Sequence, residues 1–315
     1  MNHIDITFLE KINLLLTRIK HKKLILDHAR PLPSSALVRI KQDLALEWTY
    51  HSNGIEGNSL TLVETRVVLE DGMTIGGKSL KEHFEAINHA EAISYLEELI
   101  HPNYELQMID LLKIHEFILN HIDKEFAGRF RNGIVRIVGA NFSPPNPNHI
   151  SHMLHELIVY SNTNPQELDP IILSVIFHHR FVWIHPFFNG NGRIGRLALN
   201  LLLMKYGYPP AIILKNDRKK YYSALDQANK GDYEKLTLII LQALERSLNM
   251  YINIIPNAYD EYQSISSIVE EKDIPYGFEY ISLLARSGKI NAFKEGRNWL
   301  TSKKAILDYM NRINI

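Results

Sequence analysis

The stretch that decides how this chain folds is His185-Pro186-Phe187-Phe188-Asn189-Gly190-Asn191-Gly192-Arg193-Ile194-Gly195-Arg196. An apolar run, 181–184, precedes it, and a strongly apolar run, 197–204, follows it. Glycines let the backbone turn tightly and approach a bound group closely. A helix that begins after such a turn directs free N–H groups and its positive dipole end into the turn. The pattern predicts a tight turn, an anion site and then a buried helix.

Two arginines and a histidine give this turn groups suited to binding phosphate and to accepting a proton. Arg193 and Arg196 are three residues apart, so they share one face of the first helical turn and suit phosphate oxygens. His185 stands at the rim, where an imidazole can take a proton from a hydroxyl. The residues indicate a polyphosphate site with a general base. An ordinary Gly-Asn-Gly turn with a structural histidine fits the same residues, because many helix N-termini can bind anions.

The same stretch resembles the signature of the Fic family, with which it shares a specific set of residues: His185, Pro186, Phe187, Gly190, Asn191, Gly192, Arg193 and Arg196. The resemblance implies transfer of AMP from ATP to a protein hydroxyl. It implies that His185 is the base, that Phe187 anchors the loop in the core, and that Gly190, Asn191 and Gly192 hold the phosphates. Arg193 and Arg196 then bind the β- and γ-phosphates.

Asn189 departs from the family pattern, which usually has Asp or Glu at this position to bind the magnesium that bridges the phosphates. An amide oxygen can coordinate a hard cation but brings no charge. We therefore expect Asn189 to be a weak Mg²⁺ ligand. The preferred nucleotide then also differs from what the family pattern implies.

A second motif lies upstream, where a helical run from 37 to 50 leads into Ser52-Asn53-Gly54-Ile55-Glu56-Gly57. Taken alone, it is a helix end with a glycine C-cap at Gly57 and a solvated Glu56. It also resembles the regulatory helix of many Fic proteins, in which Ser or Thr is followed, after three residues, by Glu and then Gly or Asn. That resemblance implies that Glu56 pairs with Arg196 and prevents productive placement of the γ-phosphate.

Composition narrows the classes of protein. The 315 residues contain 35 Lys plus Arg and 35 Asp plus Glu, so net charge gives no overall bias toward nucleic acid or acidic lipid. The absence of cysteine removes disulfides, thiol catalysis and cysteine-bound zinc. No apolar run is long enough to span a bilayer, and the N-terminal residues do not resemble a secretion signal. We expect a cytoplasmic protein with no membrane partner.

The rest of the chain predicts further helices and little sheet. Helical patterns cover 4–26, 62–71, 79–100, 109–122, 171–183, 221–227 and 233–251. The glycine-bounded, β-branched run 128–139 predicts a short hairpin, which the resemblance would make a flap that holds a target segment by strand addition. His149, His152 and His155 are better interpreted as helix-face residues than as a metal site, because no carboxylate completes the set.

The C-terminal part has the pattern of a small separate unit after a linker at Pro256. A helix over 259–271, a second from 275 to 285, two strands around Glu295-Gly296 and a final helix resemble a winged helix. Its basic residues outnumber its acidic ones slightly, which suggests DNA as a partner but also fits a role in dimerisation or in presenting targets.

The patterns predict a mainly α protein, and the resemblance to the Fic family implies an N-terminal helical region carrying the inhibitory motif (1–100), a Fic catalytic core (101–255) and a winged helix-turn-helix-like unit (256–315). The expected function is protein adenylylation of a Tyr, Thr or Ser hydroxyl on a target protein and on the chain itself, with ATP as substrate. One alternative is a DNA-binding regulator whose Fic core senses nucleotide. Another is a Fic enzyme that removes AMP or transfers another nucleotide.

Overall fold

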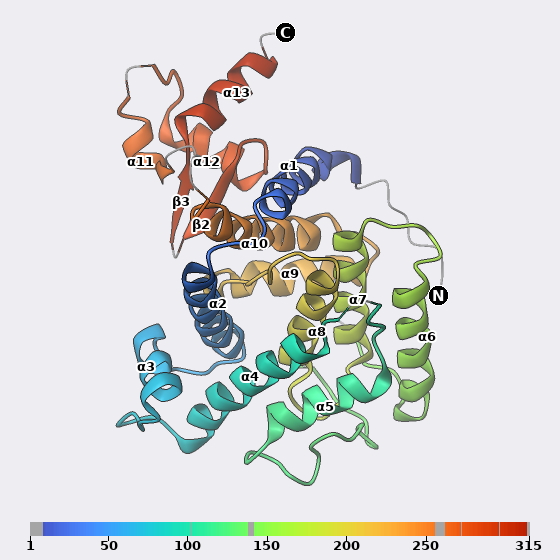
Figure 1. Ribbon diagram of the computed structural model, residues 1–315. Helices are drawn as coiled ribbons and strands as arrows, with labels where there is room; N and C mark the ends of the chain where they lie inside the picture. The colour runs from blue at the N-terminus through green and yellow to red at the C-terminus, as the bar shows by residue number, and fades with distance from the viewer. Residues whose placement is uncertain are drawn as a thin grey trace.

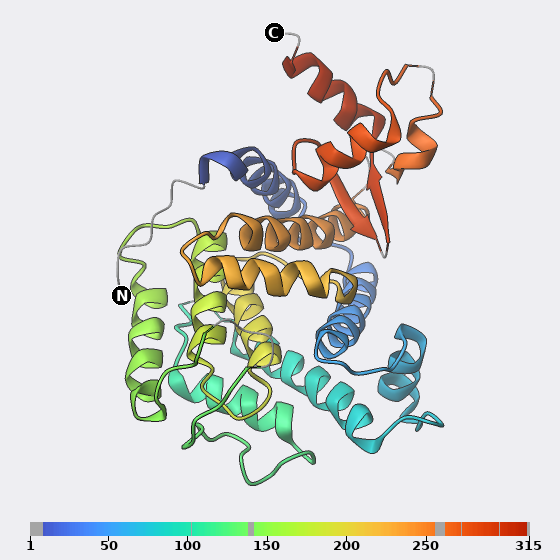
Figure 2. The same cartoon turned by 180° about the vertical axis from the view of Figure 1, so that it is seen from behind.

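The computed structural model describes residues 9–101, 103–137, 142–255, 262–271, 273–295 and 297–313. These parts form a helical body from which a smaller C-terminal unit projects at one end, as both views show (Figures 1 and 2). The helices of the N-terminal part are α1 (Leu9–His28), α2 (Ser34–Ile55), α3 (Leu62–Arg66), a π-helical turn η1 (Val67–Asp71), α4 (Leu80–Leu99) and α5 (Met108–Leu119).

The central and C-terminal elements follow in chain order. They are the 3₁₀ turn η2 (Pro147–His149), α6 (Ile150–Thr163), α7 (Pro170–Ile184), α8 (Asn191–Lys205), the 3₁₀ turn η3 (Lys215–Asp217), α9 (Arg218–Ala228), α10 (Glu234–Ile252), β1 (Gln263–Ser264), α11 (Ile265–Ile268), α12 (Phe278–Arg286), β2 (Ala292–Glu295), β3 (Asn298–Thr301) and α13 (Lys303–Ile313). The mainly α fold expected from the sequence is confirmed.

The antiparallel pair α7 and α8 forms the centre of the body. Asp169 caps α7 by accepting a hydrogen bond from the Ile171 N–H, and Pro170 occupies the first helical position, where its missing N–H costs nothing. Helix α8 packs along α7 and contacts α5, α4 and α2 (Figure 1). The two helices approach closely at Gly195, where a Cβ would lie 2.8 Å from Val182 Cγ2.

Helices α2 and α4 bring the N-terminal region to this pair. Helix α4 begins with a reciprocal capping box between Ser79 and Glu82. Helix α2 is longer than its apolar pattern indicates and continues through the second motif to Ile55. Gly57, with φ of 104°, then ends it as the expected glycine cap, because that conformation strains any residue with a Cβ.

The prediction of a hairpin over 128–139 is wrong for the described part of that range. Residues 128–137 contain no strand, and 138–139 lie outside the described residues. The physical reason is that Arg131 ties this segment to other parts of the chain: its N–H donates to Pro186 O at 2.9 Å, and its side chain donates to the carbonyls of Gly133, Pro145 and His185.

The C-terminal unit combines three strands with short helices. The strands form an antiparallel sheet in the order β1-β3-β2, with Phe293 opposite Leu300 in the β2–β3 pair. The two strands expected around Glu295-Gly296 are therefore present, although residue 296 itself is outside the described part. The helix expected over 259–271 is wrong for most of its described residues, since only Ile265–Ile268 is helical and 263–264 is a strand. The expected linker at Pro256 lies outside the described residues.

Candidate active site

The turn 185–190 and the first turn of α8 are held in shape by Asn191. Its Oδ1 accepts the Phe187 N–H at 3.0 Å, and its Nδ2 donates to Phe187 O at 2.8 Å. Phe187 is fully buried and stacks on the His115 ring, with the centroids 3.7 Å apart. Gly190, with φ of 80°, is the last residue before α8. Asn191 thus locks the turn while Phe187 anchors it in the core, so the backbone at the start of α8 is rigid.

His185 caps the C-terminal end of α7 in a left-handed conformation, with φ of 52°. Its Nδ1 lies 3.3 Å from Val182 O, which assigns the proton to Nδ1 and leaves the Nε2 lone pair free. Burial lowers the pKa of His185 to about 4, more than the Val182 hydrogen bond and the charge of Glu56 raise it. The imidazole is therefore neutral near pH 7, in the form that accepts a proton.

Arg131 positions His185. The sequence analysis did not identify Arg131 as a site residue. Its guanidinium donates from Nε to His185 O at 2.7 Å, from Nη1 to Gly133 O at 2.9 Å and from Nη2 to Pro145 O at 2.6 Å. Three carbonyls from three segments converge on one cation, which is buried. The only sequence signal was an arginine inside a glycine-bounded run, and that signal does not distinguish it from Arg129 or Arg136.

Arg196 is held by the second motif. Its Nη2 lies 2.8 Å from Glu56 Oε1 and donates to Ser52 O at 2.9 Å, and its Nε donates to Ser52 Oγ at 3.1 Å. Burial raises the pKa of Glu56, but the charge and hydrogen bond of Arg196, together with the charges of Arg193 and Arg218, outweigh it, so the net shift is downward and Glu56 is a carboxylate. The contact that the resemblance implied between Glu56 and Arg196 is present in this structure.

Gly192 shows how closely Glu56 covers the start of α8. A Cβ at residue 192 would lie 2.2 Å from Glu56 Oε1, so only glycine fits beneath the carboxylate. The N-terminal N–H groups of a helix attract anions. Glu56 therefore sits as an anion at the position where the sequence predicted one.

Arg193 points to a different carboxylate, on α4. Its Nη1 lies 3.3 Å from Glu85 Oε1, and its Nη2 lies 3.5 Å from Asn189 Oδ1. Arg193 and Glu85 are both buried. Reasoning from the sequence missed Glu85, because it looks like any other acidic residue of a polar helix and nothing local marks it as buried.

Some donors of these arginines lack acceptors. Arg193 Nε and Arg196 Nη1 are buried and find no hydrogen-bond acceptor among the described residues. A buried guanidinium N–H without an acceptor is costly. Two of them beside a helix N-terminus fit a site that receives the oxygens of an anionic ligand.

The residues present do not build a magnesium site on their own. Asn189 is exposed, and its neutral Oδ1 already accepts the Gly190 N–H at 2.7 Å. No group of three or more His, Asp or Glu residues in the described ranges is arranged to hold a metal ion. His149, His152 and His155 lie exposed along η2 and α6. The expectation that Asn189 is at best a weak ligand therefore stays a prediction.

The end of α2 is held by contacts on two sides. On one side Asn53 donates to Glu85 O at 3.0 Å and Asn58 donates to Glu85 Oε2 at 3.0 Å, which ties the motif to α4. On the other side Arg218 donates to Ile55 O at 2.6 Å. The carbonyl groups that a helix end leaves free are thus partly satisfied. The backbone from which the Glu56 side chain extends is therefore fixed.

Comparisons with known proteins identify a family that this chain resembles. Residues 105–203, which include the turn and α8 but not Glu56, match the model of the Fic/DOC family. The chain is 38% identical over 220 residues to the protein adenylyltransferase Fic of Drosophila virilis, which covers 70% of this chain and 45% of that protein. The chain thus spans less than half the length of this relative.

Solved structures extend the similarity to the fold. Fic-1 from C. elegans is 34% identical with a TM-score of 0.69, over 76% of this chain and 71% of that chain. A Fic family protein from Desulfovibrio desulfuricans is 20% identical with a TM-score of 0.63, over 98% of this chain and 85% of that one. At that identity the second likeness concerns the fold alone, and it includes the C-terminal unit. Among the described residues no helix has the length and apolar character needed to cross a membrane.

Proposed function

Because this chain belongs to the Fic/DOC family, we propose that it is a protein adenylyltransferase that transfers AMP from ATP to a Tyr, Thr or Ser hydroxyl of a target protein and of the chain itself. The observation that carries the proposal is the neutral His185 with its free Nε2, held at the rim of a helix N-terminus that also presents two buried arginines. The name of the Drosophila virilis relative supports the same reaction. The cytoplasmic location stays a prediction from the sequence.

The chain's own groups account for the movement of the proton and the leaving group. The hydroxyl oxygen of the target forms a bond to the α-phosphorus, and the bond from that phosphorus to the bridging oxygen breaks, so that pyrophosphate leaves. His185 Nε2 takes the hydroxyl proton. The phosphates of ATP are negatively charged and raise the pKa of the neighbouring imidazole, as Glu56 does in the free protein, which makes His185 a better base in the complex.

We further propose that Glu56 inhibits the reaction in this conformation. Arg196 is occupied by Glu56 and Ser52, and the Glu56 carboxylate covers the start of α8. A polyphosphate must displace that carboxylate to reach Arg196, since both are anions that bind the N–H groups of the same guanidinium. A coupling of this kind is typically about 1–3 kcal/mol, which corresponds to roughly 5- to 150-fold in activity on release.

Incubation with α-labelled ATP tests the proposal. Glu56→Gly should raise covalent self-labelling about 5- to 150-fold, and Glu56→Asp, one methylene shorter, should raise it less. His185→Ala in the Glu56→Gly background should lower labelling by roughly 10² to 10⁴-fold for loss of one general base, with ATP binding retained. Arg196→Ala in the same background should remove the gain.

A matched control is available at the far end of α8. Glu105 is an exposed loop residue that acts electrostatically on Lys205, the last residue of that helix. Glu105→Gly removes the same charge and should leave labelling unchanged. ATP bound without any covalent label in the Glu56→Gly protein would instead favour the nucleotide-sensing regulator, and release of AMP from a labelled target would favour AMP removal.

A further inference from the structure

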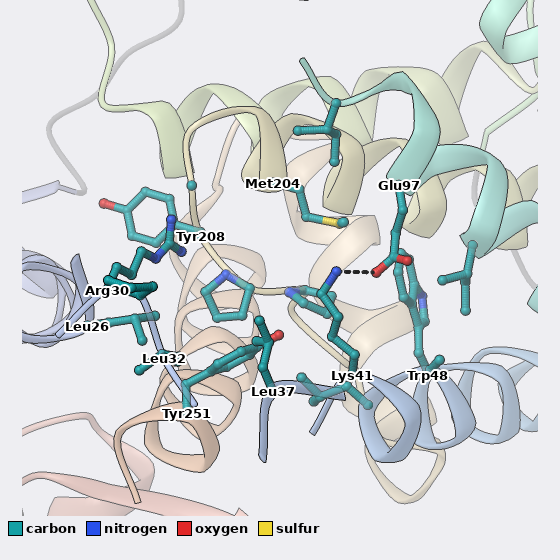
Figure 3. Close-up of a pocket in the computed structure, with 18 residues that line it drawn as sticks. Leu26, Arg30, Leu32, Leu37, Lys41, Trp48, Glu97, Met204, Tyr208 and Tyr251 are labelled. Atoms are coloured by element: carbon teal, nitrogen blue, oxygen red, sulfur yellow. Dashed lines mark ion pairs between the residues drawn. The ribbon is translucent and has the colours of Figure 1, made fainter. Parts of the chain in front are cut away.

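Two cavities of this protein differ in their charge. The first, of about 700 Å³, lies between α2 and α4 and has mostly apolar and aromatic walls (Figure 3). Its charged side chains have partners of opposite charge: Lys41 lies 3.4 Å from Glu97, and Arg30 lies 3.8 Å from Asp27. It therefore offers no excess charge to a ligand. The second cavity does.

This second cavity, of about 540 Å³, lies where the C-terminal unit meets the body. One wall is the face of α10 from Lys235 to Arg246, eleven residues apart and so about 16 Å along the helix. The segment before α9 and the first half of α9 form another wall, and α12, β2 and β3 each contribute one residue to a third. A volume of this size suits a small organic molecule.

The inner surface of this cavity is apolar. It includes the buried side chains of Ile212, Leu214 and Ala243 and the half-buried Leu238. Trp299 of β3 is also half-buried and lines the cavity. An indole ring at a cavity wall offers a flat surface on which another ring can stack. The inner surface therefore fits an apolar ring.

The charged side chains of this cavity are mostly cations. Lys220 and Lys294 share the carboxylate of Asp217, at 3.3 and 2.7 Å, and Arg246 pairs with Glu47 of α2 at 2.6 Å. Asp217 is the one carboxylate among the described lining residues, against six cations. The six are Lys219, Lys220, Lys235, Arg246, Arg286 and Lys294. The cavity thus has a clear excess of positive charge even after its ion pairs are counted.

Three of these cations, Lys219, Lys235 and Arg286, have no carboxylate partner in the part of the chain that the structure describes. All three are exposed, so they stand at the rim above the apolar surface. Gln242 of α10 donates to Arg286 O at 3.0 Å, which places Arg286 beside a point seven residues, or about 10 Å, along α10 from Lys235. Cations spread in this way fit several separate anionic groups better than a single one.

We propose that this cavity binds a small aromatic molecule that carries two or more phosphate groups. The ring lies against Trp299 and the apolar surface, and the phosphates reach Lys219, Lys235 and Arg286. Lysine and arginine N–H groups form charge-assisted hydrogen bonds with phosphate oxygens, which are stronger than neutral ones. The ligand contacts the body and the C-terminal unit together. This site is separate from the start of α8 and does not rest on the proposed transfer of AMP.

Titration calorimetry at low salt tests the site, with naphthalene-1,5-diyl bisphosphate as the probe. We expect a Kd on the order of 0.1 mM for a ligand of this size. The same ring with one phosphate, 1-naphthyl phosphate, and with none, 1-naphthol, should each bind about 2- to 5-fold more weakly than the compound before it. Added salt should weaken the bisphosphate most, because it screens exposed charges. Equal affinity for the three compounds would overturn the proposal.

Ser223 allows a matched test of charge inside the cavity. It is an exposed residue of α9 that belongs to the lining. Ser223→Glu places a carboxylate among the cations, whereas Ser223→Gln adds a side chain of the same size without charge. The bisphosphate should bind the Glu variant about fivefold more weakly than the Gln variant. The same Kd for both variants would contradict binding in this cavity.

Lys235→Gln removes one cation that has no carboxylate partner and should weaken the bisphosphate about 2- to 5-fold. Lys230→Gln is its control, because Lys230 is exposed, lies five residues earlier and is outside the lining. That substitution should leave the Kd unchanged. Thermal melting checks that each variant is folded. If the two substitutions weaken binding equally, the probe responds to the net charge of the surface and the site is overturned.

Discussion

Two carboxylates, the partly exposed Glu56 and the buried Glu85, contact the arginines of α8 from two different helices, and each fixes one side chain. Glu56, at the end of α2, lies 2.8 Å from Arg196. Glu85, on α4, lies 3.3 Å from Arg193. Buried arginines that lose their partner are strongly destabilising. The free protein is therefore stable with its arginines neutralised, and a polyphosphate ligand has to replace the charge that it displaces.

The protonation state of His185 gives a prediction that does not depend on turnover. Because burial lowers its pKa to about 4, the imidazole should stay neutral as the pH falls from 8 to 5 and become charged only near pH 4. Long-range ¹H–¹⁵N NMR of the Glu56→Gly protein should show the Nδ1-protonated tautomer throughout that range. Removing Glu56 takes away a charge that raises the pKa, so the midpoint should not rise. A midpoint near the ordinary value of 6.5 would contradict this account.

Asn189 leads to a prediction on magnesium. Its amide oxygen is neutral and already accepts the Gly190 N–H, so wild-type transfer should need a high magnesium concentration. Asn189→Asp adds a charge at an exposed position and should lower the half-saturating concentration. Transfer measured against Mg²⁺ in the Glu56→Gly background decides the point. An unchanged half-saturating concentration would mean that residue 189 is not a ligand.

Among the secondary-structure elements, the C-terminal end of α2 determines where Glu56 lies. Gly57 has φ of 104° and open space where a Cβ would lie, so Gly57→Ala introduces backbone strain without a clash. We expect a loss of about 1–2 kcal/mol in stability and a rise in self-labelling, because the strain is relieved when the helix end moves. Chemical denaturation and labelling with ATP measure the two effects.

Gly72 is the matched control for that substitution. It also has a positive φ, 64°, and open space where a Cβ would lie, but it follows η1 instead of the inhibitory motif. Gly72→Ala should cost comparable stability and leave labelling unchanged. If both substitutions raise labelling equally, general loosening of the fold and not the end of α2 is responsible.

In the molecule as a whole, the C-terminal unit is joined to the body through α1 and α10. Glu245 is completely buried and pairs with Arg18 and Lys22. The same two cations continue to the C-terminal unit, where Arg18 donates to Gly288 O and Lys22 donates to Asn291. The unit therefore completes a polar cluster that belongs to the body.

Removal of residues 256–315 tests the proposed division into units. The helices of the body keep their core, so we expect it to fold. Arg18 and Lys22 lose acceptors, so its melting temperature should fall by about 2–8 °C, which corresponds to roughly 1–2 kcal/mol for a chain of this size. Circular dichroism during heating measures it. An unfolded product would show that the body and the C-terminal unit are one cooperative domain.

Charge on the C-terminal unit favours an interaction role over DNA binding. Lys294 pairs with Asp217, and Lys303 with Glu271 and Asp273, so part of the basic excess is neutralised internally. Helix α12 exposes two large apolar side chains, Phe278 and Leu283, each 53% exposed, beside the exposed Glu279 and Arg286. We expect no salt-dependent shift of a random duplex by the full chain. A shift that disappears steeply as salt rises would restore the DNA-binding alternative.

Local spacing in the sequence was enough to establish several features of this protein. The apolar period placed the buried helices, and the glycines placed the turn before α8 and the end of α2. The order of residues 185–196 predicted a base and two phosphate-binding arginines, and those roles stay predictions. Such features can be predicted locally, because backbone geometry and helical period act over a few residues. The link between Glu56 and Arg196 came from resemblance to a family, since no spacing rule relates residues 140 positions apart.

Which ordinary residues take part in the site depends instead on the packing of distant segments. Glu85 and Arg131 lie in polar stretches, and they matter because folding places one against Arg193 and the other beneath three carbonyls. The same dependence on distant partners explains why residues 128–137 are not a hairpin, since the Arg131 N–H bonds to the 185–190 turn and not to a neighbouring strand. The cavity between α2 and α4 likewise exists only where several segments meet. Burial and long-range pairing arise from packing, and packing is a property of the whole chain.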